Sequence, residues 1–556
     1  MGAPGLLPKE TVGLVDDSGS NRPRESAWRV GLSSRVRRVY LCLLFGLLLL
    51  GGATFILKCF HDVPYPFAWD DDDGAVWWEI AHVTNLRALY HPIQEYPYFV
   101  TPYPPVYHAV TWLAARVTGN IQVAGRLVCI FSALGMSLVF GLLVFQASPR
   151  RIPARIRASG AALAALLCFR LDSLSSYMPG IGVDPSAVFL SFLGVWLFVR
   201  FAPRAGWTHV AFTIFVLAVF TKETAVAAPM ACLIASALID AKKAIRLLAF
   251  YLTLALVILA YLSWQTRGEI LRHLFVYNAQ QPFSITHLIL GMQENLVRML
   301  PLVALACLAF LPFVHHVLFA KRHEFVLWLR AGVRSSPYRR ALFVLGLELV
   351  TALLISVSYG KVGGGYHYFL EWNLACCPLV GLLMVRAIDS WRPSSRYTLG
   401  GAALFLLLFL AALTGFPESL YRLDSVFRLT PGVRRIQDAQ YSSAAAALKI
   451  VEETPGPVLC QNMVLVMKAH KEIPIEPGIQ CFLSKTGVWD QSGFVGMISS
   501  QKFGVIIMRT LNNSYWTDEI VAAIKEYYVP SEQIGDETIE DSHYTVYRPK
   551  PNLSAR

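Results

Sequence analysis

Residues 39–74 read VYLCLLFGLLLLGGATFILKCFHDVPYPFAWDDDDG, an uncharged apolar run followed by a short loop that ends in four consecutive aspartates. The apolar run, residues 39–57, is long enough for an α-helix to cross the hydrocarbon core of a bilayer. The four aspartates bring like charges to contact distance, where they resist ionising together. The stretch therefore predicts a membrane protein that keeps a costly acidic cluster beside its first span, and stability alone does not explain such a cluster.

The whole chain has the composition of an integral membrane protein. Of its 556 residues, 55% are hydrophobic and 15% are charged. The first 38 residues are polar and carry seven bases, and no small-residue cleavage site follows the first apolar run, so we expect that run to stay as an anchor. Further uncharged runs near membrane-spanning length are Leu127–Ala147, Leu247–Trp264, Met299–Ala320 and Tyr397–Phe416.

The basic residues of this apolar part gather in short segments between the expected spans. This is the positive-inside pattern, and it predicts that these segments face the cytoplasm. The formal net charge is +12, but a nucleic-acid surface would need contiguous bases interleaved with aromatic residues on a polar scaffold. The distribution therefore argues against nucleic-acid binding. The basic segments are 150–157, 242–246, 321–340 and 386–396.

A consistent topology follows from these segments. The N-terminus lies inside, the first span ends near Lys58, and the loop 58–124, which contains the aspartates, lies outside. The apolar segment Pro105–Val117 in that loop is too short to cross, and we expect it to form a helix lying in the outer interface. Eleven spans result, and the last leaves the C-terminal part outside. The spans after the first lie near 125–147, 159–178, 185–200, 208–221, 224–240, 246–264, 298–319, 341–358, 371–388 and 398–416.

The expected fold class is mainly α, a polytopic transmembrane helical bundle of about eleven spans with a small C-terminal extracytoplasmic α/β domain. Cys460 and Cys481 lie in that domain, where an oxidising compartment would allow a disulfide, although no spacing motif requires one. Its β-like runs are 457–460, 503–508 and 544–547, and its helical stretches are 442–453 and 517–528. Three regions are expected: a cytoplasmic basic segment (1–38), the transmembrane domain (39–416) and the α/β domain (417–556).

Polar residues near the outer ends of the expected spans all map to one side of the membrane. Ionisable groups near a membrane core are functional candidates, because their burial is expensive. The set comprises Asp70–Asp73, Glu79, Tyr107 in the turn Tyr103–Tyr107, Arg126, Asp184, Lys222, Glu223, Tyr366, His367, Tyr368 and Glu371.

The aspartates allow three interpretations. They cap the helix expected after Gly74 and meet its dipole, or one of them acts as a general base toward an attacking hydroxyl while its neighbours raise its basicity. In the third interpretation, Asp70 and Asp72 form an Asp-x-Asp pair that holds a hard cation. Capping explains one or two carboxylates well and four poorly, so the sequence favours base chemistry. No cofactor is required, and a divalent metal stays open as an alternative.

The cationic candidates also carry two interpretations. Lys222, in the segment Phe220–Thr224, either extends to the interface without a function or binds a phosphate, with Glu223 or Asp184 orienting it. Arg126 opens a span and would serve the same anion. The segment Tyr366–Glu371, which includes His367, follows the glycine-rich segment 360–365, and we expect it to close over a substrate. Tyr107 is a further candidate for substrate binding.

The order of these motifs resembles the GT-C superfamily of membrane glycosyltransferases, which includes the protein O-mannosyltransferases, the aminoarabinose transferase of lipid A and the lipopolysaccharide-core galacturonosyltransferase-like proteins. The resemblance covers residues 39–416. The motifs, in chain order, are Asp72-Asp73-Gly74, Leu89-Tyr90, Tyr103-Pro-Pro-Val-Tyr107, Arg126-Leu127, Thr221-Lys-Glu-Thr224 and Tyr368-Phe-Leu-Glu371.

The resemblance implies inverting transfer of a sugar from a polyprenyl-phosphate carrier to an acceptor hydroxyl of a glycolipid, polysaccharide or protein, at the outer face of a bacterial inner membrane. By position, Asp73 or Asp72 matches the base of the first outer loop. Lys222 and Arg126 match the residues that hold the carrier phosphate, and Asp184 matches an acidic position that orients them. Many relatives carry Asp-Glu or Gly-Glu where this chain has four aspartates, which leaves the identity of the base and the metal alternative open.

Two other functions remain as alternatives. A transporter or flippase for a lipid-linked substrate would place charged residues in the middle of its spans, preferably with inverted internal repeats, and neither is evident in the sequence. A catalytically inactive relative that serves as a binding subunit would have no need of both the acidic cluster and Lys222.

Overall fold

The computed structural model of the chain describes residues 25–69, 72–175, 178–201, 205–311, 322–361, 363–390, 398–511, 515–539 and 541–551. The chain consists of two compact units, residues 1–44 and residues 45–556. In the first unit, the described residues are the beginning of helix α1 (Glu25–Asp62). The second unit contains the rest of α1 and all the other elements.

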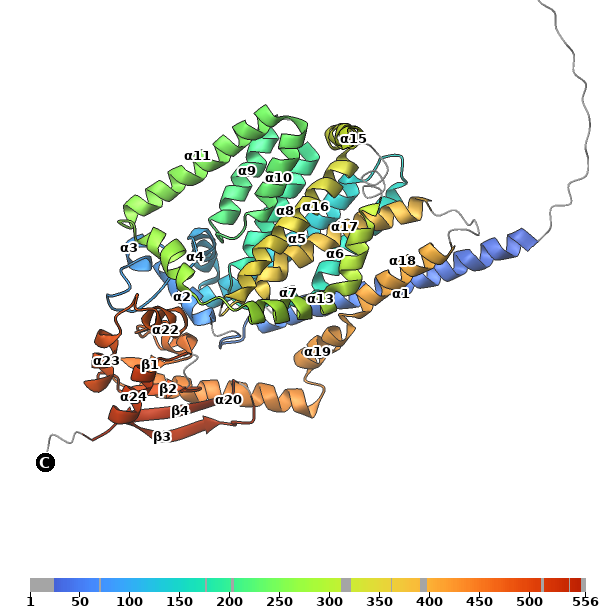
Figure 1. The fold of residues 1–556 in the computed structure, drawn as a ribbon. Helices are drawn as coiled ribbons and strands as arrows, with labels where there is room; N and C mark the ends of the chain where they lie inside the picture. Colours follow the sequence, from blue (N-terminus) through green and yellow to red (C-terminus); the bar gives the residue numbers. More distant parts are fainter. Residues whose placement is uncertain are drawn as a thin grey trace, which may run out of the picture. The chain divides into compact units, whose positions relative to one another are not determined.

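Helix α17 (Leu370–Ser390) lies at the centre of the helical part of the second unit (Figure 1). In the most apolar window of Tyr366–Asp389, 89% of the residues are buried, whereas in that of α11 (Ala241–Gln265) only 11% are buried. A helix that is apolar and buried on all sides belongs to a bundle core, and one that leaves its apolar side chains exposed is typical of the lipid-facing periphery. The other long helices are α5 (Ile121–Ala147), α6 (Ala154–Leu167), α8 (Asp184–Phe201), α9 (Ala205–Val219), α10 (Ala227–Ile239), α13 (Ile285–Leu308), α15 (Arg322–Ser335), α16 (Pro337–Ile355) and α18 (Thr398–Leu413).

The described residues contain eight helices that are long and apolar enough to span a membrane, which makes the chain a multi-pass membrane protein. The three further spans expected at 159–178, 208–221 and 224–240 correspond to the shorter helices α6, α9 and α10, of 14, 15 and 13 residues. Polar positions interrupt these helices. A 3₁₀ turn that ends at the buried Arg170 follows α6, and the polar turn Thr221–Thr224 separates α9 from α10. Of the span expected near 298–319, residues 312–319 lie outside the described part.

Three short helices follow the aspartate stretch: α2 (Asp73–His82), α3 (Leu86–Leu89) and α4 (Val106–Thr118). The expected helix at Pro105–Val117 is confirmed as α4, which ends at Gly119 in the left-handed conformation that glycine adopts without strain. Helix α2 approaches the C-terminal part so closely that a Cβ at Gly74 would lie 2.5 Å from the Cβ of Met463. The glycine after the aspartates is therefore a packing requirement.

The C-terminal part contains a four-stranded sheet in the order β1-β2-β4-β3. Strands β1 and β2 are parallel, and β4 is antiparallel to both β2 and β3. The expected strands and helices are confirmed; strand β3 and helices α19, α21, α22 and α23 are additions. The sequence of β3, YVPSEQIG, contains a proline and leaves most of its residues exposed, as suits an edge strand. The elements are α19 (Phe416–Phe427), α20 (Pro431–Glu453), β1 (Val458–Cys460), α21 (Met463–Lys468), α22 (Pro477–Lys485), α23 (Ser492–Ser499), β2 (Val505–Met508), α24 (Asp518–Tyr527), β3 (Tyr528–Gly535) and β4 (His543–Pro549).

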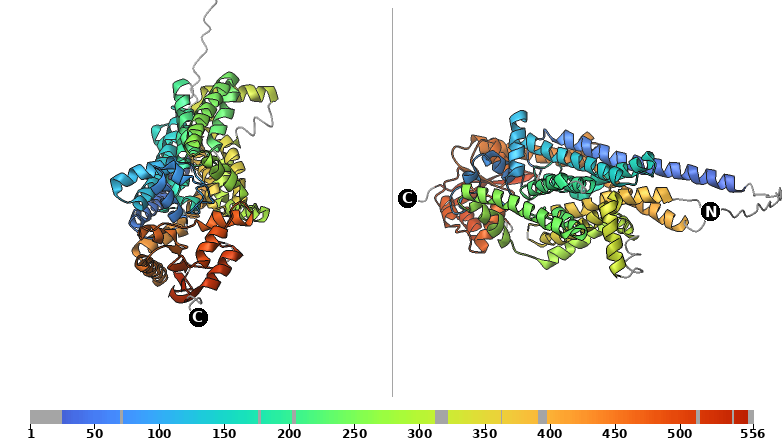
Figure 2. Two further views of the ribbon diagram at one scale, coloured as in Figure 1. Left: turned by 90° about the vertical axis from the view of Figure 1, so that its left-hand side faces the viewer. Right: turned by 90° about the horizontal axis from the view of Figure 1, so that it is seen from above.

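The sheet lies at the end of the helical part where α2 and α3 are found (Figures 1 and 2). Backbone bonds join the two regions, because Tyr98 N–H donates to Pro474 O at 2.9 Å and Glu476 N–H donates to Tyr98 O at 3.0 Å. Cys460 and Cys481 are both buried free thiols, so the disulfide considered from the sequence is not formed. This docking places the C-terminal part beside the aspartate loop.

Candidate functional site

A cavity of about 130 Å³ lies where the starts of α2 and α8 meet the end of α1. It brings together four of the residues singled out in the sequence, which come from three distant segments: Asp72, Asp73, Asp184 and His367. Lys58, Trp69 and Tyr103 complete its polar and aromatic wall. We call it the aspartate cavity.

A second, smaller cavity adjoins the first, since Asp184 and His367 line both. Lys222, Tyr368 and Glu371 line only the second, which we call the lysine cavity. The two cavities together therefore gather most of the predicted site, although its members lie up to 299 positions apart in the chain, from Asp72 to Glu371. Helical and loop segments that are unrelated in sequence supply them.

Lys222 occupies the turn between α9 and α10. Its ammonium forms an ion pair with Asp184 and lies 4.9 Å from the ring centre of Tyr368 and 6.0 Å from that of Tyr103. Burial alone would lower the pKa of Lys222, but Asp184 and the neighbouring groups raise it above its ordinary value, so the side chain stays charged. Only 7% of the side chain is exposed, which argues against an interfacial lysine that merely extends toward water.

Asp73 holds the entry of α2 in place. Its carboxylate accepts hydrogen bonds from Trp69 N–H at 2.9 Å and from Ile181 N–H at 2.8 Å, one on each oxygen. The nearest guanidinium nitrogen of Arg126 lies 3.9 Å away. A carboxylate that accepts two backbone N–H bonds and faces a guanidinium is stabilised in its charged form, and its bonds fix two stretches of the cavity wall.

Asp72 differs from its neighbour. It precedes the first residue of α2, yet its side chain makes no capping hydrogen bond, so capping does not explain this carboxylate. Burial raises the pKa of Tyr103 well above its ordinary value, and the carboxylates of Asp184 and Asp72 raise it further. Asp72, Asp184 and Tyr103 all line the aspartate cavity, so both carboxylates lie near the tyrosine. Asp70 and Asp71 lie outside the described residues.

A divalent cation finds a poor fit in this part of the site. No group of three or more His, Cys, Asp or Glu side chains among the described residues is arranged to hold a metal. The carboxylate of Asp184 already carries the Lys222 ammonium, which would repel a second cation. The proposed pair of Asp70 and Asp72 falls partly outside the described residues.

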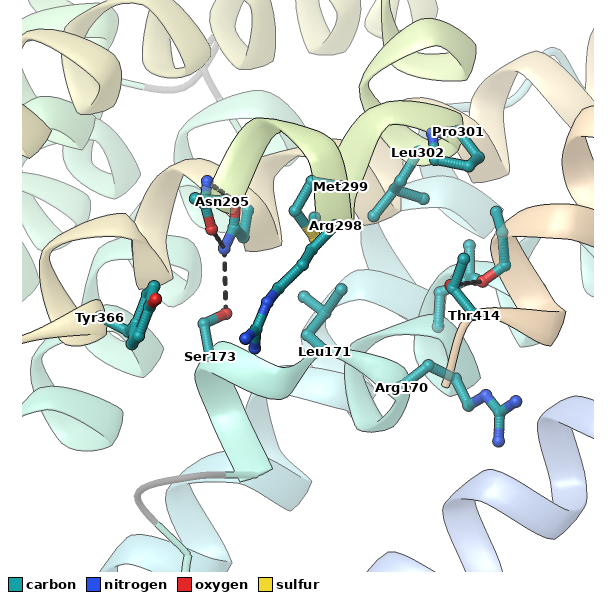
Figure 3. A pocket seen from close by; sticks show the side chains of 13 residues that line it. Arg170, Leu171, Ser173, Asn295, Arg298, Met299, Pro301, Leu302, Tyr366 and Thr414 are labelled. Carbon is teal, nitrogen blue, oxygen red and sulfur yellow. Dashed lines mark hydrogen bonds between the residues drawn. The ribbon is translucent and has the colours of Figure 1, made fainter. Parts of the chain in front are cut away.

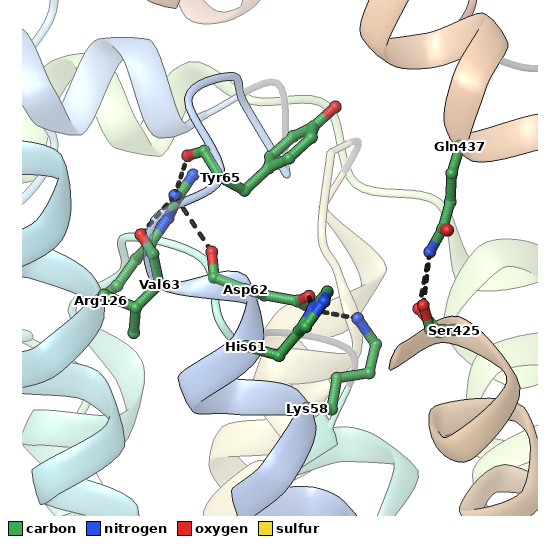
Figure 4. Close-up of polar contacts among 8 residues, drawn as sticks. All are labelled: Lys58, His61, Asp62, Val63, Tyr65, Arg126, Ser425 and Gln437. Atoms are coloured by element: carbon green, nitrogen blue, oxygen red, sulfur yellow. Dashed lines mark hydrogen bonds and ion pairs between the residues drawn. The ribbon is translucent and has the colours of Figure 1, made fainter. Parts of the chain in front are cut away.

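Figure 4 shows the Arg126 guanidinium beside the turn that carries Asp62, Val63 and Tyr65. The guanidinium is fully buried and donates to the carbonyl oxygens of Asp62 at 3.4 Å and Val63 at 3.1 Å, of Tyr65, and of Phe67 at 2.7 Å. It lines neither cavity. The structure thus gives Arg126 the geometry of a clamp on the turn 62–67, and does not bring it beside Lys222 as a second ligand for a phosphate.

Three other predicted residues also lie outside the two cavities. The Tyr107 hydroxyl donates to Gly125 O at 3.4 Å, in the packing between α4 and α5. Tyr366 faces a different cavity, of about 190 Å³, beside a reciprocal amide pair of Asn295 and Asn373 (Figure 3). Glu223 accepts a hydrogen bond from the Asn278 amide at 3.3 Å.

Lys58 and Trp69 are cavity residues that sequence reasoning missed. Lys58 forms an ion pair with Asp62, and its ammonium lies 4.7 Å from the ring centre of Trp69. In the sequence, Lys58 marks only the end of the first span, and Trp69 only the residue before the aspartates. A lone base next to a membrane run is so often an interfacial anchor that its position carried no functional signal.

No protein-family model matches the sequence, and no curated protein matches it. Among solved structures, ArnT from Cupriavidus metallidurans in the apo state aligns with a TM-score of 0.54 at 13% identity, over 91% of this chain and 98% of that chain. The same protein bound to undecaprenyl phosphate aligns with a TM-score of 0.53 at 13% identity, over 91% of this chain and 99% of that chain.

The chain therefore has the fold of ArnT, in agreement with the resemblance of its motif order to the GT-C membrane glycosyltransferases. The similarity extends over the helical part and the C-terminal α/β part alike, since it covers nine-tenths of the chain. At 13% identity it establishes the fold. The chemistry has to be argued from the two cavities.

Proposed function

We propose that this protein is a glycosyltransferase that moves a sugar from a polyprenyl-phosphate carrier to an acceptor hydroxyl at the outer face of a bacterial inner membrane. One observation carries the proposal: a buried, charged lysine and the carboxylate of Asp72 face two adjoining cavities that share Asp184 and His367. Displacement of a phosphate by a hydroxyl needs a cation and a base near the reacting atoms, and these two residues line adjoining cavities. The fold, which is shared with a protein solved with undecaprenyl phosphate, supports this choice of carrier.

In the proposed reaction, the acceptor hydroxyl attacks the anomeric carbon of the donor sugar. Asp72 takes the hydroxyl proton as the new carbon–oxygen bond forms. The bond between the anomeric carbon and the carrier phosphate oxygen breaks, and its electron pair leaves with the phosphate, whose negative charge Lys222 balances, with Lys58 near the same space. A single displacement of this kind inverts the configuration at the anomeric carbon.

The other residues act through these groups. Asp184 orients Lys222 and keeps it charged, and Asp73 holds Trp69 and Ile181 in the wall of the aspartate cavity. His367 and Glu371 complete the boundary of the lysine cavity. We propose that residues 1–38 lie in the cytoplasm, that 39–416 form the transmembrane catalytic domain, and that 417–556 lie outside, so that the acceptor reaches the site from the outer side.

Release of free carrier phosphate tests the proposal. The purified full chain in detergent is incubated with a panel of polyprenyl-phosphate sugars and acceptors, with and without EDTA. We expect Asp72→Asn to slow release by about 100-fold or more while the variant folds, because a general base is worth that much. Asp438→Asn, an exposed aspartate of α20, is the matched control. Full activity in both Asp72→Asn and Asp73→Asn would falsify the assignment, and EDTA-sensitive release restored by a divalent cation would reassign the aspartates to a metal.

A transporter for a lipid-linked substrate stays the second candidate, because one observation favours it. Glu348 lies within the apolar helix α16, is fully buried, and has no hydrogen-bond partner for either carboxylate oxygen among the described residues. An ionisable group within a span is the feature that the transporter alternative requires. Movement of a lipid-linked sugar across proteoliposomes without release of carrier phosphate would select this candidate.

A further inference from the structure

A third cavity, of about 200 Å³, lies between the loop that precedes the aspartates and the C-terminal sheet. The loop contributes Tyr65 and Trp69, and the C-terminal part contributes Asn462, Arg509, Asp541 and Tyr544. None of these residues has a role in the reaction proposed above except Trp69, which also lines the aspartate cavity. We call it the interdomain cavity.

The loop side of this cavity is aromatic. The rings of Tyr65 and Trp69 lie 4.4 Å apart, and Phe67 packs against Tyr441 at 5.3 Å. Trp69 is 37% exposed and Tyr441 is 50% exposed, so large ring surfaces stay open to solvent. Of these, Trp69 lines the cavity, and aromatic side chains in a cavity wall are typical of binding sites.

The opposite side supplies polar groups without a surplus of charge. Arg509 donates to the Asp541 carboxylate at 2.7 Å, so the two charges offset each other. The Asn462 amide donates to the Tyr544 hydroxyl at 3.1 Å. Donors and acceptors thus lie side by side, which suits a ligand whose groups both donate and accept, such as hydroxyls. A neutral cavity of this kind has no preference for an anion or a cation.

Trp69 connects this cavity to the chemistry. Its ring lines both the interdomain cavity and the aspartate cavity, and its backbone N–H donates to Asp73. A ligand on the C-terminal side of Trp69 therefore lies next to the space that Asp72 faces. The aromatic faces fit the C–H surfaces of a sugar ring, and the polar groups fit its hydroxyls.

We infer that the interdomain cavity binds neutral sugar residues of the acceptor and delivers an acceptor hydroxyl to the aspartate cavity. The inference rests on the proposed glycosyltransferase function and names its acceptor class as a neutral glycan. The same neutral sugars could belong to a free glycan or to the headgroup of a glycolipid. Soluble neutral oligosaccharides and the same sugars on a lipid anchor are therefore tested as separate arms.

Two variants probe the cavity without touching the catalytic residues. Tyr65→Leu removes one aromatic face, and the Tyr65 carbonyl that Arg126 holds stays in place. Asp541→Asn removes the carboxylate, and asparagine tolerates the positive φ of 58° at this position. Tyr421→Leu and Asp438→Asn, at exposed positions of α19 and α20 outside the cavity, are the matched controls.

Binding is measured first, by tryptophan fluorescence of the full chain in detergent titrated with neutral oligosaccharides. We expect saturable binding that weakens about tenfold in Tyr65→Leu, as loss of a stacking partner costs on the order of 1 kcal/mol. We expect a similar loss in Asp541→Asn and none in the controls. Absence of binding to the wild type in both arms, or equal binding by all the variants, would overturn the inference.

Turnover then separates this inference from the proposed function. We expect both cavity variants to raise the KM for the acceptor about tenfold, while release of carrier phosphate to water without acceptor keeps its wild-type rate. If the wild type binds sugars but releases no carrier phosphate from any donor, the glycosyltransferase proposal fails and acceptor delivery fails with it. If the wild type turns over and both variants keep the wild-type KM, only the interdomain cavity is wrongly assigned.

Discussion

Arg126 and Lys222 are both buried cations near the aspartate loop, and the structure surrounds them differently. The Arg126 guanidinium contacts four backbone carbonyl groups of the turn 62–67 and lines no part of the two cavities. The Lys222 ammonium has one carboxylate partner and borders the lysine cavity. The hydrogen bonds of Arg126 therefore hold the fold together, whereas Lys222 keeps N–H donors that a ligand could use.

The comparison shows how a binding charge can be told from a structural one. Both are expensive to bury, so burial alone does not distinguish them. The distinguishing observation is what surrounds each cation. Four protein carbonyls contact the Arg126 guanidinium, whereas the Lys222 ammonium pairs with Asp184 and borders a cavity of about 20 Å³, which has room for about one water molecule. Asp73 belongs with Arg126, since its carboxylate accepts two backbone N–H bonds that hold the cavity wall.

Arg126→Met gives the largest expected effect. It leaves four backbone carbonyls without their guanidinium donor and Asp73 without its ion-pair partner, so we expect a loss of about 3–5 kcal/mol of stability and a poor yield of folded protein. Arg126→Lys should not rescue the fold, because an ammonium cannot replace the planar fork of donors. Thermal unfolding in detergent is the measurement, with the exposed Arg116→Met as control. If Arg126→Met is stable but no longer binds carrier phosphate, Arg126 is a phosphate-binding residue and does not differ from Lys222 in the way described above.

Lys222→Met is expected to slow carrier-phosphate release by about 100-fold, the usual cost of losing one charge-stabilising donor. The single variant also strands Asp184 in a buried position, so its stability should fall. The double variant Lys222→Met, Asp184→Asn should recover that stability without recovering activity. Release kinetics and thermal unfolding of the three variants test this, and recovery of both properties in the double variant would give Lys222 a structural role only.

His273 is a buried group that, like Arg126, holds the fold together, but its imidazole is neutral. Its Nδ1 accepts from Thr101 N–H at 3.0 Å, and its Nε2–H donates to His91 O at 2.8 Å. Burial lowers the pKa of His273 to about 4. A lowered folded-state pKa means that the stabilisation is present above the unfolded value near pH 6.5 and is lost as the pH falls from there toward 4.

Unfolding temperatures between pH 7 and pH 5 measure this loss. We expect a decrease of at most about 2 kcal/mol in the wild type over that interval. The decrease should be absent in His273→Asn and unchanged in the exposed control His470→Asn. If His273→Asn loses stability between pH 7 and pH 5 as the wild type does, His273 is not the group whose protonation destabilises the fold.

Glu348→Met is expected to have the smallest effect on turnover. A fully buried carboxyl without a hydrogen-bond partner costs stability, so the apolar replacement should raise the free energy of unfolding by about 1–2 kcal/mol and leave carrier-phosphate release unchanged. Unfolding and release are compared with those of the exposed control Glu537→Gln. A less stable and inactive Glu348→Met would show that this carboxyl gains a partner during function, as a transporter requires.

Much of the fold followed from local sequence. Apolar length predicted the membrane helices, and short β-like runs between helical stretches predicted β1, β2 and β4, because both signals depend on neighbouring residues. Strand β3 escaped notice, since its polar, proline-containing sequence is held by pairing with β4 along one edge. The short helices α6, α9 and α10 were expected to span the membrane, because the apolar sequence continues beyond one end of each helix. In the structure the helices stop at turns that contain polar residues, such as Arg170 after α6 and Lys222 between α9 and α10.

The sequence by itself determined that this is a multi-pass membrane protein with the motif order of the GT-C fold and with acids and bases near the ends of its spans. Only the tertiary structure decided which of these charges face a space and which face the backbone. Lys222, Asp184, Asp72 and His367 converge on two cavities, whereas Arg126, Tyr107 and Tyr366 do not. The physical reason is that hydropathy is a property of neighbours in the chain, while the partners of a buried charge come from segments far apart in sequence that packing brings together.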